Sequence, residues 1–239
     1  MEEPRNEGMP VATDRSAALL GQEAMERLKD VRITLFGVGG VGSWCAEGLI
    51  RTGVRHLTIV DCDSVDVTNI NRQLMATAST VGRPKVEVLK ERLTDICPEA
   101  EITALHRRYE GEPLEGDLKG DIVIDAIDSV DCKVALIMRA AATEGVTLVS
   151  SMGAAMKTDP TRVRTAEFWK VEGCPLARAL RNRMKKNGVR PARKFMCVFS
   201  DEQPKGDGTG TKGSIVQVTA VFGFTLCSLV VNSLANRQS

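Results

Sequence analysis

The sequence predicts an α/β protein with a doubly wound, mostly parallel, Rossmann-like sheet and a C-terminal extension of additional strands, a basic helix and a final apolar helix. Short apolar runs alternate with segments of helical periodicity over residues 31–151, which is the pattern of consecutive βαβ units. Gly37, Gly39 and Gly42 follow the first apolar run directly, as a G-x-G-x-x-G turn between a strand and a helix requires. With 239 residues, the chain suits one large domain with a substantial core.

The elements of the sheet follow from periodicity and turn residues. Leu19, Leu20, Met25 and Leu28 have helical spacing, so we expect one helix over residues 16–28 ahead of the first strand. Residues 1–13 are expected to be a flexible tail, and residues 14–239 a single domain. Strands are expected at 31–36, 56–60, 102–106, 122–126 and 147–151, and helices at 41–52, 84–96 and 130–143.

The C-terminal extension is less regular. We expect a strand at 162–166, a basic helix at 176–186, a strand at 195–199 and a glycine-rich loop at 201–213. Residues 215–234 are mostly apolar, but six polar side chains interrupt them. A buried C-terminal helix is therefore preferred over a membrane span.

Composition limits the class of protein. The net charge of +1 gives no general argument for an acidic or a basic partner. Seven cysteines without a C-x-x-C pair argue against zinc and against a disulfide framework, and they fit a reducing cytoplasm. Residues 1–13 have no apolar core, so no signal peptide is expected.

The glycine turn indicates a phosphate site. One glycine permits the tight turn, one lets backbone amides approach a phosphate, and one lets the following helix pack on the strand. Gly40 adds a position without a side chain, and the free N–H groups of the next helix favour anions. Asp61 and Asp63 end the next strand, about where a ribose hydroxyl is held. An ordinary glycine-rich turn, or the dinucleotide site of an NAD-dependent oxidoreductase, uses the same pattern.

Further motifs stand in order along the chain: RSAALLG at 15–21, DVTNINRQ at 66–73, VGRPKVEV at 81–88 and DAIDSVDCK at 125–133. Together with the glycine turn they resemble the ubiquitin-activating-enzyme-like adenylating superfamily of the ThiF and MoeB type. The resemblance covers about residues 15–128 and implies ATP and Mg²⁺ as ligands. It places Asn69, Arg72 and Lys85 on the phosphates, Asp61 on the ribose and Asp128 on Mg²⁺.

Adenylation explains why such residues are needed. A carboxylate attacks the α-phosphate of ATP, so cations must neutralise the reacting anions and the departing pyrophosphate. Arg15 matches an arginine that reaches the phosphates of a partner subunit, so the resemblance implies a homodimer. Arg15, Arg72, Lys85 and Asp128 are then the catalytic candidates. Taken singly, each of them is better explained as a surface charge or a turn residue, and only the set in this order favours ATP. A further alternative is a scaffold that keeps the fold without catalysis.

A second resemblance covers the C-terminal half. DAIDSVDCKVALI, CPLARALRNRMKKNGV at 174–189, CVFSDEQP at 197–204 and GSIVQVTAVFGF at 213–224 resemble the tRNA threonylcarbamoyladenosine dehydratase family. This implies that ATP activates the carboxylate of the threonylcarbamoyl group by adenylation, and that cyclisation to the hydantoin form follows. The alternative is an adenylyltransferase for a ubiquitin-like sulfur-carrier protein, but such enzymes generally carry two C-x-x-C pairs, which this chain lacks.

A tRNA substrate also accounts for an uneven charge distribution. Eight cations and no acids occupy residues 177–195, and removing them from the 32 Lys and Arg leaves 24 against 31 acids, a net charge of −7. The candidates for binding tRNA phosphates are Arg178, Arg181, Arg183, Lys185, Lys186, Arg190, Arg193 and Lys194. A solvated amphipathic helix is the alternative. Phe168, Trp169 and Phe195 are candidates for stacking on an unpaired base.

Other residues have open roles. Cys197 aligns with a cysteine near the position where sulfur-activating relatives place a nucleophile, but its apolar neighbours favour a structural role. His56 and His106 stand at strand ends and are interpreted as structural. A monovalent cation near the glycine-rich loop and a sulfur-transfer partner are further candidates that the residues alone do not identify.

Overall fold

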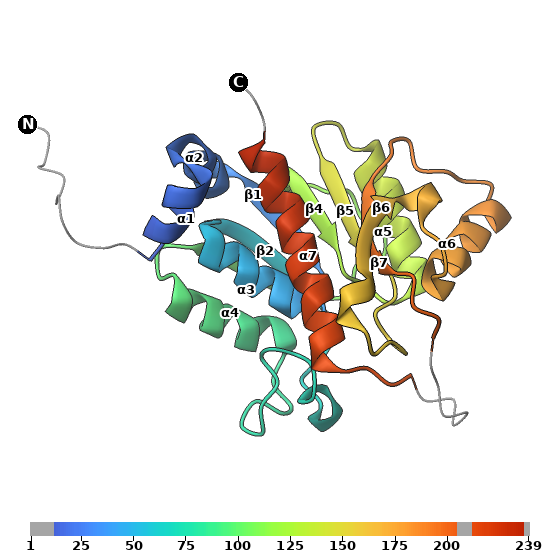
Figure 1. Ribbon diagram of the computed structural model, residues 1–239, viewed down its shortest axis with the longest axis horizontal. Helices are drawn as coiled ribbons and strands as arrows, with labels where there is room; N and C mark the ends of the chain where they lie inside the picture. Colours follow the sequence, from blue (N-terminus) through green and yellow to red (C-terminus); the bar gives the residue numbers. More distant parts are fainter. Residues whose placement is uncertain (1–11, 205–211, 237–239) are drawn as a thin grey trace, which may run out of the picture.

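A seven-stranded sheet with the order β3-β2-β1-β4-β5-β7-β6 organises the computed structural model, which describes residues 12–204 and 212–236 (Figure 1). Neighbouring strands are parallel except β6 and β7, which are antiparallel. The doubly wound, mostly parallel sheet predicted from the sequence is confirmed. Most of the predicted tail, and residues 205–211 of the predicted glycine-rich loop, lie outside the described residues.

The element bounds agree with the predictions to within a few residues after the first strand. The strands are β1 Arg32–Phe36, β2 His56–Asp61, β3 Glu101–His106, β4 Ile122–Asp125, β5 Thr147–Ser151, β6 Val163–Glu167 and β7 Met196–Ser200. The α-helices are α1 Asp14–Leu20, α2 Gln22–Asp30, α3 Gly42–Thr52, α4 Lys85–Ile96, α5 Val130–Ala142, α6 Pro175–Lys186 and α7 Val216–Ala235. Short 3-10 helices include η1 Val67–Asn69 and η4 Phe168–Lys170.

The helix predicted over residues 16–28 is wrong as a single element. Gly21 separates α1 from α2 with φ of 82° and ψ of 159°, a conformation that glycine adopts without the steric cost of a Cβ. Its N–H still donates to the carbonyl of Ala17. Helical spacing continues across the break, so periodicity alone did not reveal it.

The antiparallel edge strand has a simple cause. Parallel neighbours need a crossover of a dozen or more residues, usually a helix, and only residues 152–162 connect β5 to β6. β6 therefore becomes the outer strand, and β7 pairs parallel with β5 after the longer excursion through α6.

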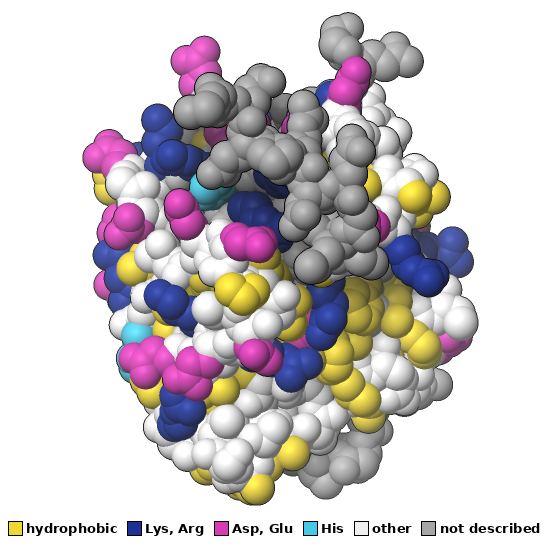
Figure 2. Space-filling view, turned by 90° about the vertical axis from the view of Figure 1, so that its left-hand side faces the viewer, with side chains coloured by type: hydrophobic (Ala, Val, Ile, Leu, Met, Phe, Trp, Pro, Cys, Tyr) yellow, Lys and Arg dark blue, Asp and Glu magenta, His cyan; other side chains and the backbone are white. Residues whose placement is uncertain are grey.

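Helices cover both faces of the sheet. Leu49 of α3, Leu89 of α4 and Phe222 of α7 belong to one core cluster, whereas Ile137 of α5 and Leu180 of α6 belong to a second. In Figure 1, α7 crosses the front of the sheet beside α3. The surface on the side of α1 to α4 carries cations and acids interspersed (Figure 2), in keeping with the small net charge.

α7 packs tightly against α3. A Cβ on Gly223 would lie 2.5 Å from the carbonyl oxygen of Val41, and one on Gly48 would lie 3.1 Å from the sulfur of Cys227. Glycines at these positions allow the two helices to approach closely. By length and composition α7 could cross a membrane, and half of its apolar window is buried within the protein. This burial supports the interpretation as a packed C-terminal helix.

The sheet reverses its strand order between β1 and β4. These strands are neighbours, although β2 and β3 come between them in the sequence. In open α/β sheets, ligands bind at the carboxyl ends of the strands at such a switch point. The turn after β1 and the loop after β4 therefore enclose the expected binding crevice.

Candidate active site

A cavity of about 520 Å³ lies at this switch point, a size typical of small-molecule sites. Its walls bring together residues from the turn after β1, the end of β2, the loop before α4 and the loop after β4. Of the predicted site residues, those that line it are Gly37, Gly39, Gly40, Asp61, Asp63, Arg72, Lys85 and Asp128. Gly42 and Asn69 lie outside the lining, as does Arg15 on α1.

The glycine turn has the shape that a phosphate cradle needs. Gly37 has φ of 86°, and a Cβ there would lie 2.7 Å from the carbonyl oxygen of Ala126. At Gly42, a Cβ would lie 1.9 Å from the carbonyl oxygen of Gly37. By contrast, a Cβ on Gly39 would approach only the side chain of Gln73, at 3.8 Å. Two glycines thus permit the fold of the turn, and the third leaves its backbone open to a ligand.

Asp61 holds the turn in place. Its carboxylate accepts hydrogen bonds from the N–H of Val38 at 2.7 Å and from the N–H of Asp63 at 2.9 Å. These bonds join the end of β2 to the turn after β1. They also leave the half-buried carboxylate on the cavity wall, where the sequence predicts a ribose contact.

Lys85 opens α4 and is buried, with 5% of its surface exposed. Its Nζ donates to Oδ2 of Asp63 at 2.8 Å. The hydrogen bond from Lys85 holds the pKa of the Asp63 carboxyl below its ordinary value. The pair places a fixed ammonium group on the cavity wall beside the glycine turn.

Arg72 and Asn69 belong to the same loop, but only the Arg72 side chain is free to contact a ligand in the cavity. Arg72 lines the cavity, and its Nη1 donates to the carbonyl of Thr68 and to the side chain of Asn71. Asn69 is buried, and its side-chain oxygen accepts from the N–H of Asp66 in a reciprocal capping box of η1. In this structure Asn69 shapes the loop that presents Arg72.

Asp128 is exposed in the loop after β4, above a buried network that the sequence-based reasoning missed. Lys133 and Asp125 form an ion pair at 2.8 Å with both side chains fully buried. Nζ of Lys133 also donates to the carbonyl of Ile127 at 3.0 Å, and Ser150 donates to Asp125 at 2.7 Å. Burial raises the pKa of the Asp125 carboxyl, and the Lys133 ammonium opposes this shift. The network fixes the residue that precedes Asp128.

Two arginines on the cavity wall were also missed. Arg107 and Arg108 follow β3 directly and line the cavity near Cys62. The register pairs Asp61 of β2 with His106 of β3, so the arginines stand beside the end of β2. Two consecutive cations at the carboxyl end of a predicted strand were the signal available in the sequence.

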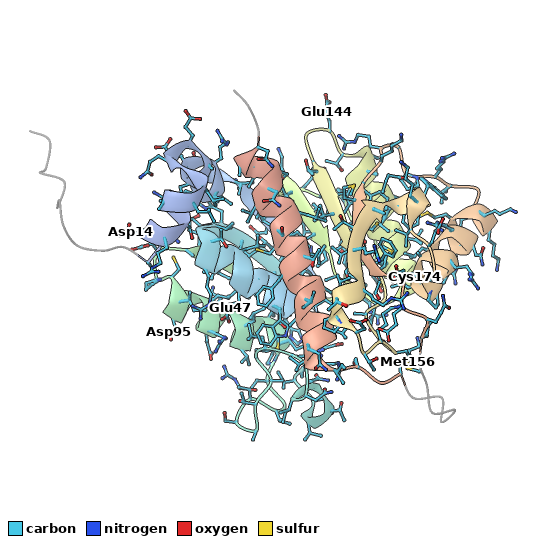
Figure 3. The ribbon with its side chains drawn as sticks, in the orientation of Figure 1. Asp14, Glu47, Asp95, Glu144, Met156 and Cys174 are labelled. Carbon is cyan, nitrogen blue, oxygen red and sulfur yellow. The ribbon has the colours of Figure 1, made fainter. Side chains whose placement is uncertain are left out.

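The basic segment does not form one surface around the cavity. Leu176, near the start of α6, lines the cavity, and Lys185 lies nine residues further on, about 14 Å along the axis. Arg193 donates to the carbonyls of Ala141 and Thr143 at the end of α5, at the amino edge of the sheet. In Figure 3, Glu144 marks this edge and Met156 the cavity edge.

Several of the eight cations also have structural partners. Arg181 donates to the carbonyls of Phe168 and Val171, and Arg183 contacts Asp131. The exposed cations without such hydrogen bonds among the described residues are Arg178, Lys185, Lys186, Arg190 and Lys194. Any phosphate contacts along α6 would therefore come mainly from this smaller set.

The aromatic stacking candidates are mostly buried. Phe168 and Phe195 stack on each other at 5.0 Å in the core, so neither is free to receive a base. Trp169 is 37% exposed, and the guanidinium of Arg190 covers its ring at 4.8 Å. Only Trp169 of the three remains accessible, at the amino edge.

The remaining candidates have structural surroundings. Cys197 is fully buried in β7 opposite Ser150, and burial raises the pKa of its thiol well above the ordinary value. His56 pairs with Glu101 at 3.0 Å, and Nε2 of His106 lies 2.9 Å from the carbonyl oxygen of Cys62. These contacts agree with the structural roles preferred from the sequence.

The chain resembles known proteins over most of its length. It matches the ThiF family over residues 13–239. It is 44% identical over 192 residues to the tRNA threonylcarbamoyladenosine dehydratase of Bacillus subtilis, covering 80% of this chain and 74% of that protein. It is also similar to the crystal structure of the Escherichia coli tRNA N6-threonylcarbamoyladenosine dehydratase in complex with ATP, with a TM-score of 0.87, 37% identity and coverage of 95% and 96% of the two chains.

The sulfur-carrier adenylyltransferase, which is the alternative function predicted from the sequence, matches a smaller part of the chain. The sulfur carrier protein ThiS adenylyltransferase of Escherichia coli is 34% identical over 109 residues, which are 45% of this chain and 43% of that protein. The family match and the dehydratase matches, in contrast, extend through the C-terminal half. This chain therefore belongs to the ThiF family, within the group of tRNA threonylcarbamoyladenosine dehydratases.

Proposed function

We propose that this protein uses ATP to activate the carboxylate of the threonylcarbamoyl group on a tRNA adenosine and so closes the group into its cyclic form. The observation that carries the proposal is the single cavity that unites the glycine turn, Lys85, Arg72 and Asp128. A dehydratase relative with the same fold over almost the whole chain is described in complex with ATP. The residues of this cavity suit ATP in charge and in shape.

The first step joins two anions. A carboxylate oxygen of the tRNA group attacks the α-phosphorus of ATP, the bond to the bridging oxygen breaks, and pyrophosphate leaves. Lys85 and Arg72 supply fixed positive charge beside the glycine turn, where the phosphates would lie. Preorganised charges of this kind stabilise a transition state more than mobile solvent does.

The second step needs no nucleophile from the protein. The carbamoyl nitrogen attacks the activated carboxyl carbon, a C–N bond forms, the C–O bond to AMP breaks, and the nitrogen loses a proton. The net change in the nucleoside is the loss of one water, with ATP converted to AMP and pyrophosphate. The burial of Cys197 is consistent with a reaction that does not use this thiol.

Asp128 is the residue that fits Mg²⁺. It is an exposed carboxylate on the cavity wall, and carboxylate oxygens are preferred ligands of this ion. Bound Mg²⁺ supplies charge neutralisation at phosphate oxygens. Lys133 and Asp125 hold the backbone just before Asp128, so that its carboxylate stays at the cavity edge.

The decisive test is the reaction itself. The full chain is incubated with Mg²⁺, ATP and tRNA that carries the linear modification, and the nucleosides and AMP are measured. We expect AMP and a nucleoside lighter by one water, and no AMP with unmodified tRNA. An unchanged nucleoside contradicts the proposal. Pyrophosphate exchange that depends on a Gly-Gly-ended carrier protein would instead identify a sulfur-carrier adenylyltransferase.

We also propose a cytoplasmic homodimer in which Arg15 acts on the partner subunit's ATP. Arg15 is exposed on α1, a helix without buried residues whose Leu19 is 83% exposed, and it does not line its own cavity. Mixing Arg15→Ala with Lys85→Met chains tests the arrangement, because a hybrid dimer would contain one complete site. Activity of the mixture above that of either variant alone supports action between subunits. Activity no higher than that of the separate variants argues against it.

A further inference from the structure

We propose that Arg107 and Arg108 bind the phosphates of the tRNA backbone next to the reacting adenosine, at the mouth of the cavity. The inference deepens the proposed function and rests on it. It moves the main RNA contact from the basic helix α6 to the end of β3. We call these two residues the β3 rim.

The β3 rim belongs to the reaction cavity. Arg107 and Arg108 are exposed to solvent and at the same time line the cavity that contains Lys85 and Asp128. They stand on the wall formed by the end of β3. Neither is part of the glycine turn or of the loop that carries Arg72, the two segments proposed above to face the ATP phosphates.

The charge of the rim is only weakly compensated. Arg107 has one ion pair, to Glu112 at 3.6 Å, and its side chain is 46% exposed. Within the described residues, Arg108 has no carboxylate at ion-pair distance; its strongest interaction is a hydrogen bond with the side chain of Cys62, which raises the pKa of the guanidinium. Both guanidinium groups keep donors for an anion, and arginine matches phosphate geometry well.

The backbone around the rim is held on both sides. The ring of His106 contacts the carbonyl of Cys62 at 2.9 Å. Tyr109 is buried, packs edge-on against Phe36 at 4.8 Å and donates its hydroxyl to the carbonyl of Glu112. The two arginines are thus presented by a fixed segment, so less ordering entropy opposes binding.

Reach favours the rim over α6. The reacting carboxylate must come within about 3–3.5 Å of the α-phosphorus, so its adenosine lies in the cavity mouth and its flanking phosphates lie at the edge. Lys185 and Lys186 are about 14 Å or more beyond Leu176 along the helix. They can meet only a more distant part of a tRNA.

The test compares matched pairs of charge removal in the full chain. Affinity for tRNA bearing the linear modification is measured by fluorescence anisotropy over a series of salt concentrations. For Arg107→Ala/Arg108→Ala we expect about tenfold weaker binding and a log–log salt slope smaller by about 1.4, the value for two single-strand phosphates. Lys29→Ala/Lys119→Ala removes two exposed charges remote from the cavity and should leave both quantities nearly unchanged.

Two further measurements can contradict the proposal. Affinity for ATP, measured by calorimetry, should stay within about twofold in the rim variant, because phosphate contacts to RNA are separate from the nucleotide site. An equal loss of ATP affinity would assign the rim to the nucleotide and overturn the proposal. It is also overturned if tRNA affinity is unchanged, or if Lys185→Ala/Lys186→Ala weakens it more. If the wild-type chain binds no tRNA, the proposed function itself fails.

Discussion

Two buried lysines, Lys85 and Lys133, each pair with an aspartate at 2.8 Å, but they stand in different surroundings. The partner of Lys85 is 60% exposed and both lie on the cavity wall. Lys133 and Asp125 are fully buried. An ammonium at a cavity wall can exchange its carboxylate for a phosphate, whereas a sealed pair can only hold its neighbours. Access to the cavity, more than the ion pair itself, therefore distinguishes a lysine that can bind a ligand from one that only positions its neighbours.

The sealed pair is also satisfied on every side. Lys133 donates to backbone carbonyls of residues 125 and 127, and Asp125 accepts from Ile127 and Ser150. Removing one partner of such a pair is costly because it leaves an uncompensated buried charge. The comparison therefore predicts opposite patterns of stability and activity for changes at the two lysines.

The largest effect on catalysis is expected from Asp128→Ala, which removes the residue that the sealed pair supports. We expect Mg²⁺-dependent turnover to be abolished, because the carboxylate proposed to hold the metal at the phosphates is lost. The side chain is exposed, so the unfolding free energy should change by less than about 0.5 kcal/mol. Turnover and urea unfolding are measured on the same preparation. Near-normal turnover would remove Asp128 from the site.

Lys133→Met is expected to have the largest effect on stability. The substitution leaves the buried Asp125 carboxylate without its cationic partner, and we expect a loss of about 3–5 kcal/mol in the urea unfolding free energy. A loss below about 1 kcal/mol would show that the pair is not sealed.

The double variant Asp125→Asn/Lys133→Met separates positioning from stability. Without a buried charge it should recover much of the lost stability. Its turnover should stay low and should need more Mg²⁺, because the carbonyl of Ile127 loses its donor. Recovery of normal Mg²⁺ dependence together with stability would assign the pair a purely structural role.

Lys85→Met should give the reverse pattern. Its partner Asp63 is well solvated, so we expect the unfolding free energy to fall by less than about 1 kcal/mol. ATP-dependent AMP formation should fall by about 10²–10³, as when one preorganised charge is lost from a transition state. Lys90→Met, on the exposed side of the same helix, is the matched control and should retain activity. Equal activities of the two variants would contradict the assignment.

The smallest expected effect is a pH dependence at the open pair. Lys85 lowers the pKa of Asp63 from its ordinary value of 3.8, so the ionised carboxylate stabilises the fold above about pH 4 and this contribution is lost as the pH falls further. The stability difference between wild type and Lys85→Met should narrow as the pH is lowered from about 5 to 3. Urea titrations at several pH values measure it, and a constant difference would show that Asp63 is not coupled to Lys85.

The local motifs were predictable because their residues are close in sequence. The glycine turn, Asp61 and Lys85 stand beside predicted strand or helix ends, and parallel strands bring such ends to one edge. Asn69 shows the limit of this reasoning. It belongs to the DVTNINRQ motif that also contains Arg72, yet its side chain forms the capping box with Asp66. The motif does not reveal this local hydrogen bond.

The basic segment shows a second limit. Its charges are adjacent in sequence, but α6 carries them away from the cavity, and Arg181 and Arg193 are used to bind backbone carbonyls. Arg107 and Arg108 do not form a long run of like charges, yet the end of β3 places them on the cavity wall. Charge counts along a chain do not report the direction in which a helix runs.

The sheet, the phosphate turn and the adenylating motif set could be predicted from the sequence, because they depend on periodicity, on glycines and on short spacings. Which charges share a cavity depends on the tertiary structure. It sealed Lys133 and left Lys85 open, and it set the end of β3 beside the end of β2. Such differences depend on the packing of residues that are distant in sequence, since burial and solvent access are properties of the folded surface.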